Sequence, residues 1–478
     1  MDKFLFYFPN ALMIPETHLM MSLVQNHLDK KNNKVTILTC GAGKRFTCST
    51  NIYGIPQICK ACISRRKISL SKLKGNFEVL EIKKKFYFPR KFKKRNIINL
   101  NYKNIDFGLG VYSSYTNTSR DTDLQGLKSN EVIKNLLDTS FSFYKYFDQH
   151  FSMNNYKNII TFNSRMSEKR PLLKYAKNNN LKISNFEKLT VERFFDFKDN
   201  LSQDRLFLKK AINNFLKKNK KKLFNRENSF FKKKLYGIED PLNPSVYSKE
   251  QIKDKLPKYW TSKKKNIVFF TASDDEHLAF GKDFNPPFSK NQKMLIEKTC
   301  QIIQNKKDYF FWIRVHPNLK NVKWFEREFY KKLELKYKNV KVVYPDENIS
   351  SYAMLRSAYN IICLWSLLLV EATYWRMKKS ISLTKNDFSE VGVSITPKNF
   401  LEYKNLIFQD FHESKKNRLL ALKWVQFFLN AGSKIKYFSG TYETGYKFRN
   451  HNLKLDFISK INYIIGKFRE RIINIYFN

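Results

Sequence analysis

Short apolar strands alternate with amphipathic helices between Tyr309 and Leu383, and this alternation restricts the fold more than any other feature of the chain. Strand-like segments at 309–315, 340–343 and 360–364 are each followed by polar residues or by a helix-like run. Parallel strands joined by crossover helices end at one edge of their sheet, where α/β proteins bind ligands. The stretch therefore predicts a parallel sheet with a ligand site at its carboxyl edge.

A similar alternation precedes this stretch, and the 478 residues exceed what one ordinary core accommodates. Strand patterns at 4–8, 34–39 and 158–162 come before the helix-breaking segment 240–244, and a new strand begins at 266–270. We expect an α/β protein of the GT-B type, with two Rossmann-like domains whose parallel sheets face a central cleft. The expected boundaries are 1–245 for an N-terminal, acceptor-side domain, 246–265 for a linker, 266–400 for a C-terminal, donor-side domain and 401–478 for a basic helical extension.

The chain is strongly basic, with 89 Lys and Arg against 42 Asp and Glu and a formal charge of +47. Such a charge favours anionic partners, although the codon usage of an AT-rich genome also raises the lysine content. Nucleic acid is not an expected partner, because no DNA- or RNA-binding signature is present. Contact with an anionic membrane leaflet fits better.

The N-terminal apolar run is too short for a signal peptide, and no segment approaches the roughly 20 apolar residues of a spanning helix. We expect a cytoplasmic protein, with peripheral contact at the inner membrane face.

Polar side chains at the predicted edge of the second sheet suit a phosphorylated ligand. Arg314 and His316 close one strand, and both types of side chain donate hydrogen bonds to phosphate oxygens. Ser366 precedes a helix whose N-terminus favours anions, and Glu371 lies inside that helix, where its carboxylate can accept hydrogen bonds from ribose hydroxyls. The alternative for Glu371 is an ion pair with an arginine, Arg356 or Arg376. Ser273 and Glu276, which follow the strand at 266–270, are expected at the same edge, with a solvated helix start as the alternative.

The N-terminal half offers candidates for the acceptor side of a reaction. The segment 107–111 is expected to be a strand, and another strand ends at Asn163 and Arg165. The expected acceptor-side residues are Ser113, Ser114, Arg120, Asn163 and Arg165. A general base is needed on this side, and Asp121 and Asp123 are candidates, although the sequence does not identify the base.

Four of the six cysteines are grouped near the N-terminus, namely Cys40, Cys48, Cys59 and Cys62. The close spacing of Cys59 and Cys62 is typical of half of a zinc site, and the other two complete a set of four thiolates. Reduced structural thiols are the alternative, because the spacing between Cys40 and Cys48 is wider than in usual zinc ribbons.

Four motifs in this order resemble those of bacterial capsular and surface-polysaccharide biosynthesis proteins, which are GT-B glycosyltransferases. The motifs are 271–276, the Arg-Val-His-Pro cluster at 314–317, the Ser-Ser-Tyr segment at 350–352, and the Ser-x-x-x-x-Glu-Ala motif at 366–372. The resemblance implies that His316 and Ser366 bind donor phosphate and that Glu371 holds the ribose. Ser351, from the third motif, is expected among the residues that bind the donor nucleotide. Two positions depart from the family pattern: Leu369, where a small residue is usual, and Ser164, where a glycine is common.

The leading hypothesis is transfer of a sugar from a CMP-, UDP- or GDP-linked donor to a glycan or lipid-linked acceptor. His316 would then stabilise the leaving phosphate, and no cofactor is required because basic groups and a helix N-terminus neutralise it. Two alternatives remain: transfer of a polyol phosphate, as in teichoic-acid polymerases, which share an Arg-x-His-Pro cluster, and a non-catalytic basic protein that binds membrane or nucleic acid.

Overall fold

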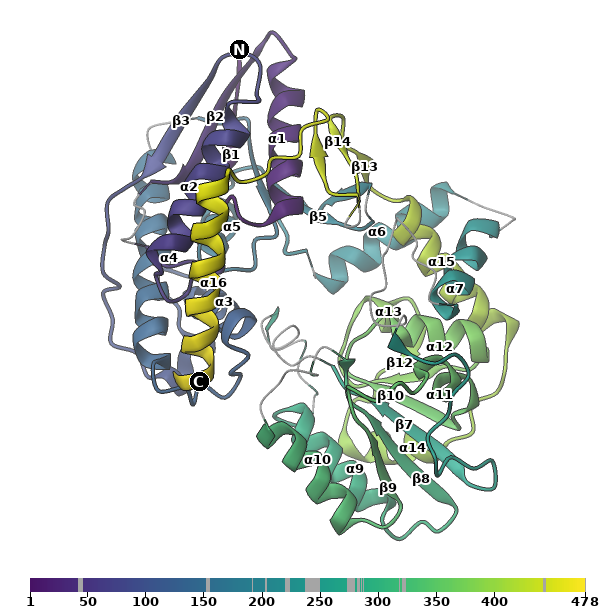
Figure 1. Ribbon diagram of the computed structural model, residues 1–478. Coiled ribbons are helices and arrows are strands. Elements are labelled where there is room, and N and C mark those ends of the chain that lie inside the picture. Colours follow the sequence, from purple (N-terminus) through teal and green to yellow (C-terminus); the bar gives the residue numbers. More distant parts are fainter. Residues whose placement is uncertain are drawn as a thin grey trace. The chain divides into compact units, whose positions relative to one another are not determined.

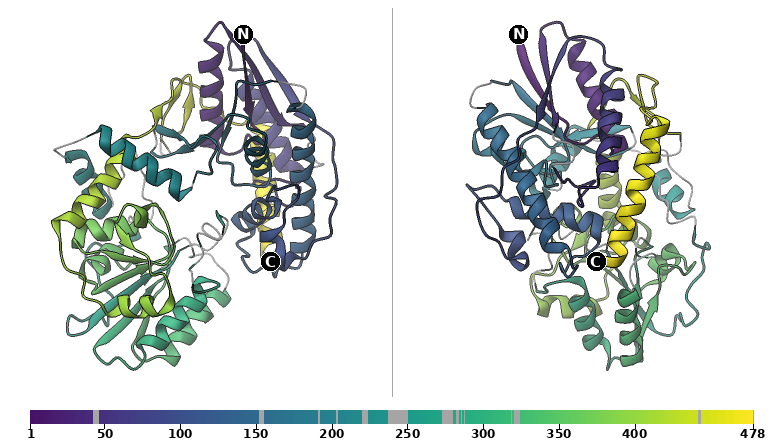
Figure 2. Two further views of the ribbon diagram at one scale, coloured as in Figure 1. Left: turned by 180° about the vertical axis from the view of Figure 1, so that it is seen from behind. Right: turned by 60° about the vertical axis from the view of Figure 1, so that its left-hand side comes forward.

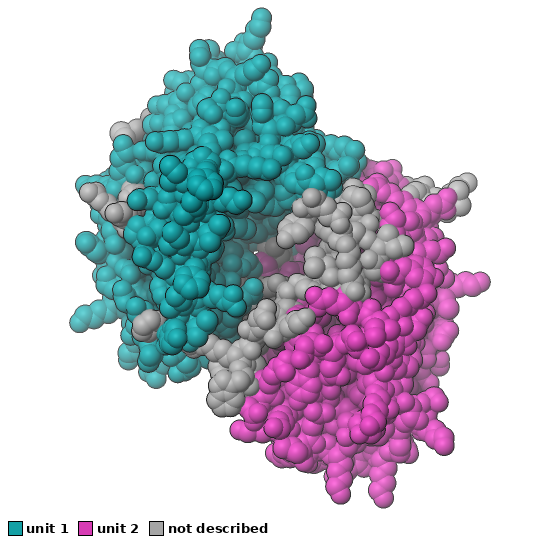
Figure 3. Space-filling view, in the orientation of Figure 1, with its two compact units in different colours: residues 1–204, 432–478 teal, residues 205–431 magenta. Residues whose placement is uncertain are grey.

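The computed structural model forms two compact units, one of residues 1–204 and 432–478 and one of residues 205–431 (Figure 3). It describes residues 1–41, 46–151, 155–190, 192–202, 204–219, 224–236, 250–272, 280–281, 284, 286, 288–317, 319, 324–441 and 444–477. Within these residues, no helix combines the length and the apolarity needed to cross a bilayer.

The first unit is built on a seven-stranded sheet with the order β13-β6-β5-β4-β1-β2-β3 (Figure 1). Strands β1 to β5 pair in parallel, whereas β6 and β13 pair antiparallel at one edge. The strands are β1 (Asp2–Tyr7), β2 (Asn33–Cys40), β3 (Phe77–Ile82), β4 (Asn158–Phe162), β5 (Ile183–Lys188), β6 (Arg193–Asp196) and β13 (Ser433–Lys434). Chain order reverses between β1 and β4, which is the topological switch of a Rossmann-like sheet.

Helices cover this sheet because each has an apolar side to bury. Helix α1 buries Leu19, Met20 and Leu23 against strand residues such as Phe6 and Val35, and α4 buries Leu136 and Phe147. The helical segments are α1 (Ile14–Leu28), α2 (Pro56–Leu70), the 3₁₀ helix η2 (Lys94–Asn99), α3 (Phe107–Ser119), α4 (Ser129–Phe151), α5 (Arg170–Asn178) and α16 (Phe457–Phe477). The short strands β14 (Phe438–Ser439) and β15 (Lys447–Phe448) form a separate hairpin.

The second unit contains a six-stranded sheet, fully parallel, with the order β12-β11-β10-β7-β8-β9. Its strands are β7 (Lys265–Phe270), β8 (Tyr309–Arg314), β9 (Val340–Val343), β10 (Asn360–Cys363), β11 (Ser380–Ser382) and β12 (Ser394–Ile395). The central strands are apolar along most of their length because helices bury both faces. The switch point lies between β7 and β10.

Nine helices of the described residues belong to the second unit. They are α6 (Arg205–Lys218), α7 (Asn225–Leu235), α9 (Gln292–Ile303), α10 (Trp324–Lys336), α11 (Ser351–Ser357), α12 (Leu368–Arg376), α13 (Asp387–Glu390), α14 (Phe400–Phe408) and α15 (Lys415–Asn430). Helix α15 packs on α12, α6 and α7. Arg205 and Lys209 of α6 form ion pairs with Glu390, the last residue of α13. These contacts place α6 and α7 with the second sheet.

The predicted class, α/β with two Rossmann-like domains as in GT-B proteins, is confirmed by the two strand orders. The division by contacts differs from the expected boundaries, because the second unit begins at Arg205 and not after the expected linker at 246–265. The extension expected at 401–478 is also divided: α14 and α15 belong to the second unit, and α16 packs on α2 of the first.

The strand expected at 107–111 is wrong, because these residues open helix α3. Gly108 lets the helix approach η2 so closely that an added Cβ would lie 1.7 Å from the carbonyl oxygen of Ile97. The apolar sequence of 107–111 resembles a buried strand in its composition. Gly108 instead allows a helix to pack tightly against η2.

Replacing Gly108 with alanine should lower the free energy of unfolding, because the new methyl group collides with backbone. We expect a loss of about 1–3 kcal/mol, as for other overpacked cores, measured by urea denaturation. Gly110→Ala in the same helix is the matched control, since its Cβ would lie 3.1 Å from the Arg170 side chain, which can shift. Equal stability of the two variants would contradict this account.

Candidate functional site

The register of three strands brings the predicted donor-side residues to one edge of the second sheet. Phe270 at the end of β7 is paired with Arg314 of β8 on one side and with Cys363 of β10 on the other. The residues that follow these strand ends surround a cavity of about 160 Å³ beside the switch point. Its lining is Lys234, Gln251, Phe270, Thr271, Arg314, His316, Pro317, Ser351, Tyr352, Ser366, Leu367, Leu368 and Glu371.

Arg314 is buried under this cavity and holds the loop after β9. Its Nη1 donates to the carbonyl oxygen of Tyr344 at 2.6 Å, and its Nε donates to the Ser351 hydroxyl at 3.3 Å. Burial lowers the pKa of Arg314 to about 10, so the guanidinium remains charged at neutral pH. The side chain therefore supplies positive charge to the cavity while its described hydrogen bonds position its neighbours.

His316 lies at the cavity in the neutral form. Its backbone N–H donates to the Thr271 hydroxyl at 2.9 Å, which ties the end of β8 to the end of β7. Burial, and secondarily the charge of Arg314, lower the pKa of His316 to about 4. A neutral imidazole offers one N–H donor and one acceptor nitrogen.

Two serines lie where helices begin at this edge. The Ser366 hydroxyl, one residue before the N-cap Leu367, accepts a hydrogen bond from Leu368 N, the first residue of α12, at 3.2 Å. Ser351 is the first residue of α11, and its N–H donates to Gln251 Oε1 at 2.7 Å. The positive end of the α12 dipole consequently faces the cavity that Ser366 lines.

Glu371 is buried in α12 and has two partners at the cavity wall. Oε2 accepts from the Tyr352 hydroxyl at 2.9 Å, and Oε1 lies 3.7 Å from Lys234 Nζ. Burial and the Glu371 charge raise the pKa of Tyr352, which keeps its hydroxyl a donor.

Neither Arg356 nor Arg376, the alternative ion-pair partners of Glu371, has a described ion pair with it. Arg356 pairs with Asp254, and Arg376 donates to the carbonyl oxygen of Tyr359. Leu369 is fully buried in the core, so its bulk is not directed at the cavity.

Four polar lining residues were not among the predicted site residues, namely Lys234, Gln251, Thr271 and Tyr352. Lys234 belongs to a lysine-rich stretch without a distinguishing pattern, and Gln251 lies far from the motifs in sequence. Thr271 and Tyr352 do fall inside motifs, which was the available signal. Ser273 and Glu276 lie outside the described residues.

In the first unit, Ser113 and Ser114 lie on α3 and are fully buried. The Ser114 hydroxyl donates to the Ser167 hydroxyl at 3.0 Å and accepts from Ser167 N at 2.8 Å. Both serines therefore join α3 to the turn after β4 and do not line a described cavity.

The two candidate bases contribute to the loop after α3. Asp121 accepts hydrogen bonds from the Tyr115 hydroxyl at 2.7 Å, from Gly126 N at 2.8 Å and from Gln125 N at 3.1 Å. Asp123 is exposed, and its carbonyl oxygen accepts from Gln125. The Asp121 carboxylate thus holds the loop after α3 in place through these three hydrogen bonds.

Arg120, at the left-handed C-cap of α3, lines a polar cavity of about 370 Å³. The other lining residues come from the start of α1, from 49–50, from the end of α3 and from α16: Leu12, Met13, Ser49, Thr50, Asn117, Thr118, Tyr463, Lys467, Glu470, Arg471 and Asn474. We refer to this as the α16 cavity.

Asn163 has φ +39° and its Oδ1 accepts from Arg165 N, so the strained position of the turn is Asn163 and not Ser164. Arg165 donates to Asn117 Oδ1 at 3.4 Å.

Glu187, near the carboxyl end of β5, has the properties of a general base that the sequence did not reveal. Burial raises its pKa to about 7, despite the nearby charges of Arg165 and Lys169. Oε1 accepts from Lys188 N at 3.0 Å, and Oε2 has no hydrogen-bond partner in the described part of the chain. Lys169 itself pairs with the buried Glu16 at 2.5 Å. In the sequence Glu187 stands between Phe186 and Lys188, which is no pattern that marks a desolvated carboxylate.

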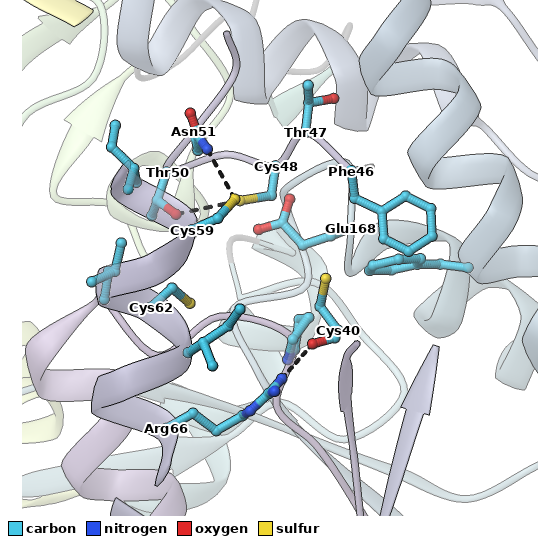
Figure 4. Close-up of a pocket in the computed structure, with 15 residues that line it drawn as sticks. Cys40, Phe46, Thr47, Cys48, Thr50, Asn51, Cys59, Cys62, Arg66 and Glu168 are labelled. Atoms are coloured by element: carbon cyan, nitrogen blue, oxygen red, sulfur yellow. Dashed lines mark hydrogen bonds between the residues drawn. The ribbon is translucent and has the colours of Figure 1, made fainter. Parts of the chain in front are cut away.

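The four grouped cysteines line one small cavity of about 40 Å³ at the carboxyl edge of the first sheet (Figure 4). Cys48 lies 3.3 Å from the Thr50 hydroxyl, Cys59 accepts from Asn51 at 3.2 Å, and Cys62 accepts from Ala11 N at 3.3 Å. Burial raises the pKa of Cys62 to about 11. Among the described residues no group of three or more His, Cys, Asp or Glu side chains is arranged to hold a metal ion. Zinc coordination by this set, with Cys40 included, stays a prediction.

No family model matches the chain, and no curated protein does either. Solved structures similar to it include the S. aureus MnaA–UDP complex, with 12% identity over 98% of both chains and a TM-score of 0.26. The UDP-GlcNAc 2-epimerase from Neisseria meningitidis bound to UDP-GlcNAc has 9% identity, coverage of 98% and 100%, and a TM-score of 0.25. The glycosyltransferase SnogD from Streptomyces nogalater has 10% identity, coverage of 90% and 95%, and a TM-score of 0.24. The fold is therefore assigned from the two strand orders and not from these similarities.

The lowered pKa of His316 predicts a pH-dependent difference in stability between the wild type and His316→Asn. Between pH 6.5 and 4 the unfolded histidine binds a proton that the folded one excludes, so the wild type loses stability as pH falls. A shift of this size corresponds to at most about 3 kcal/mol near pH 4, measured by urea denaturation across pH.

His412→Asn, at an exposed histidine of the same unit, is the matched control for loss of an imidazole. A difference between wild type and His316→Asn that stays constant from pH 7 to pH 4 would show that the imidazole is not desolvated.

Proposed function

We propose that the protein is a glycosyltransferase that binds a nucleotide-sugar donor at the cavity of the second unit. One observation carries the proposal. Arg314, His316, Ser351, Ser366 and Glu371, chosen from the sequence for donor chemistry, line a single cavity at the switch point of a parallel sheet. Ligands bind at this place in open α/β sheets.

The chemistry of the lining fits a nucleoside diphosphate. The N–H of neutral His316 and the Ser366 hydroxyl supply donors for phosphate oxygens, and the α12 dipole and Arg314 supply positive potential. Each charge-assisted hydrogen bond contributes about 1.5–3 kcal/mol. Glu371 can accept from two ribose hydroxyls if Tyr352 or Lys234 shifts slightly, because both of its oxygens are at the cavity wall.

The first unit would supply the acceptor side and the base. In an inverting reaction Glu187 takes the proton of the acceptor hydroxyl, the oxygen attacks the anomeric carbon, and the bond to the nucleotide phosphate breaks. A base with a pKa of about 7 suits this role near neutral pH. The leaving phosphate is stabilised by the groups at the second cavity. We propose a surface glycan or its lipid-linked precursor as the acceptor.

Thermal denaturation with CMP, UDP and GDP tests the donor site. A nucleotide at one hundred times its Kd stabilises by about 2.7 kcal/mol, or roughly 5–10 °C in a unit of this size. We expect one of the three nucleotides to raise the Tm, and His316→Asn and Glu371→Gln to remove most of this rise because each deletes a ligand contact.

Glu413→Gln, at an exposed carboxylate of the same unit, should keep the full rise in Tm. If none of the three nucleotides changes the Tm of the wild type, the proposed function is wrong. Incorporation of phosphate into the acceptor together with release of CMP would instead identify a polyol-phosphate transferase.

The role of Glu187 predicts the pH dependence of kcat/KM with the donor and acceptor so identified. The acidic limb of the wild-type profile should have a pKa near 7, since activity requires the carboxylate. Glu187→Gln should lower kcat/KM about 10²–10⁴-fold and remove this limb. Asp121→Asn is the comparison variant: its loop contacts predict lost stability and a retained limb. The opposite pattern would assign the base to Asp121.

A further inference from the structure

Helix α16 has one face that is fixed against the first unit. It packs on α2, and Gly466 lies so close that an added Cβ would be 2.6 Å from Ile58 Cγ1. Tyr463 and Ile473 join the same apolar cluster, and the Tyr53 hydroxyl bonds Asn474 Oδ1 at 2.5 Å. Figure 1 and the right-hand view of Figure 2 show the helix, in yellow, on the outside of the first unit, where it packs on α2.

The opposite face of α16 is apolar and exposed. At 100° per residue, Phe457, Ile464, Phe468 and Ile475 lie within about 20° of the direction opposite Gly466. Their exposed fractions are 77%, 57%, 65% and 62%. The stripe is completed by Ile458, Ile461, Ile465, Ile472 and Tyr476. A continuous apolar surface of this size on one helix marks an interaction site, because soluble proteins seldom expose one without function.

Basic residues border the stripe. Lys460 and Arg471 lie on one side of it and Arg469 on the other, all exposed. The only acidic residue of the helix, Glu470, is buried beside Lys467 and does not reach the stripe. The helix is not apolar enough to span a bilayer. An apolar face with basic borders on a helix of 21 residues is the pattern of a helix that lies in a membrane interface.

We propose that the exposed face of α16 docks the protein on an anionic lipid bilayer, with Phe457, Ile464, Phe468 and Ile475 among the acyl chains and Lys460, Arg469 and Arg471 at the headgroups. The charge of the chain decides between the occupants of this face. A second copy would bring another +47 against the same basic borders, whereas an anionic leaflet is complementary to them.

Docking in this orientation would also determine where the α16 cavity lies relative to the membrane surface. Tyr463, Lys467, Glu470, Arg471 and Asn474 line that cavity from the same helix, on the flank between the packed face and the stripe. The cavity therefore opens next to the headgroup layer. If the proposed function holds, this places the acceptor side where a lipid-linked glycan presents its phosphate and first sugars; the docking itself does not depend on that function.

Co-flotation of the full-length protein with vesicles tests the docking without any substrate. The vesicles are phosphatidylcholine alone, or phosphatidylcholine with 30% phosphatidylglycerol. We expect the wild type to float with the anionic vesicles at least tenfold more than with the neutral ones. Ile464→Glu combined with Phe468→Glu should reduce flotation at least tenfold, and Lys460, Arg469 and Arg471 changed to Gln should remove the preference for anionic lipid.

Leu127→Glu combined with Leu335→Glu is the matched control, because these leucines are 82% and 78% exposed elsewhere on the chain. It should float as the wild type does. Unchanged melting temperatures establish that the exposed substitutions leave the fold intact. The proposal is overturned if the wild type does not float, if the α16 variant floats equally, or if sedimentation shows a dimer that only the α16 variant loses, since a second copy then covers the face.

Discussion

The parallel ladder at the carboxyl ends of β7, β8 and β10 is the constraint on which the candidate donor site depends. Because Phe270 is paired with both Arg314 and Cys363, three strands end level with one another. A slip of one residue in this register would turn every side chain of the slipped strand to the other face of the sheet. The hydrogen bond from His316 N to the Thr271 side-chain hydroxyl links the two chain segments just beyond the last paired residues. The imidazole, the serine hydroxyl and the glutamate are therefore positioned by backbone pairing before any ligand contributes.

Buried charge at this edge is retained because each charged group has partners. The Arg314 guanidinium donates hydrogen bonds to the carbonyl oxygen of Tyr344 and to the Ser351 hydroxyl. Glu371 accepts a hydrogen bond from Tyr352 and forms an ion pair with Lys234. Unpaired ions in such a place would be very costly to desolvate. The same desolvation keeps His316 neutral. Burial lowers the pKa of both Arg314 and His316, but only the imidazole loses its charge at neutral pH, because the pKa of the guanidinium starts much higher.

Local patterns were sufficient to predict most of the fold and part of the site. Apolar runs such as 266–270 and 340–343 were identified as strands because both sheet faces are buried, and His316, Ser366 and Glu371 follow from their positions after such strands. Tertiary effects were not accessible. The segment 107–111 opens a helix that packs on η2 through Gly108, and the surroundings of Lys234 and Glu187 are set by neighbours that are distant in sequence. Arg314 was chosen as a donor of hydrogen bonds to phosphate, but its carbonyl partners come from a loop whose course no pattern indicates.

The second unit is an insertion within the first, since the chain leaves the first unit at Asp204 and returns at Gly432. On the ribosome, residues 205–431 emerge as one continuous segment and can complete their own sheet. The first unit has to wait for β13, which closes the edge beside β6, and for α16, which covers α2. During synthesis the edge of β6 and the apolar surface of α2 are therefore open while the later unit already folds. The first unit is therefore complete only after the whole second unit has been synthesised, because β13 and α16 follow that unit in the chain.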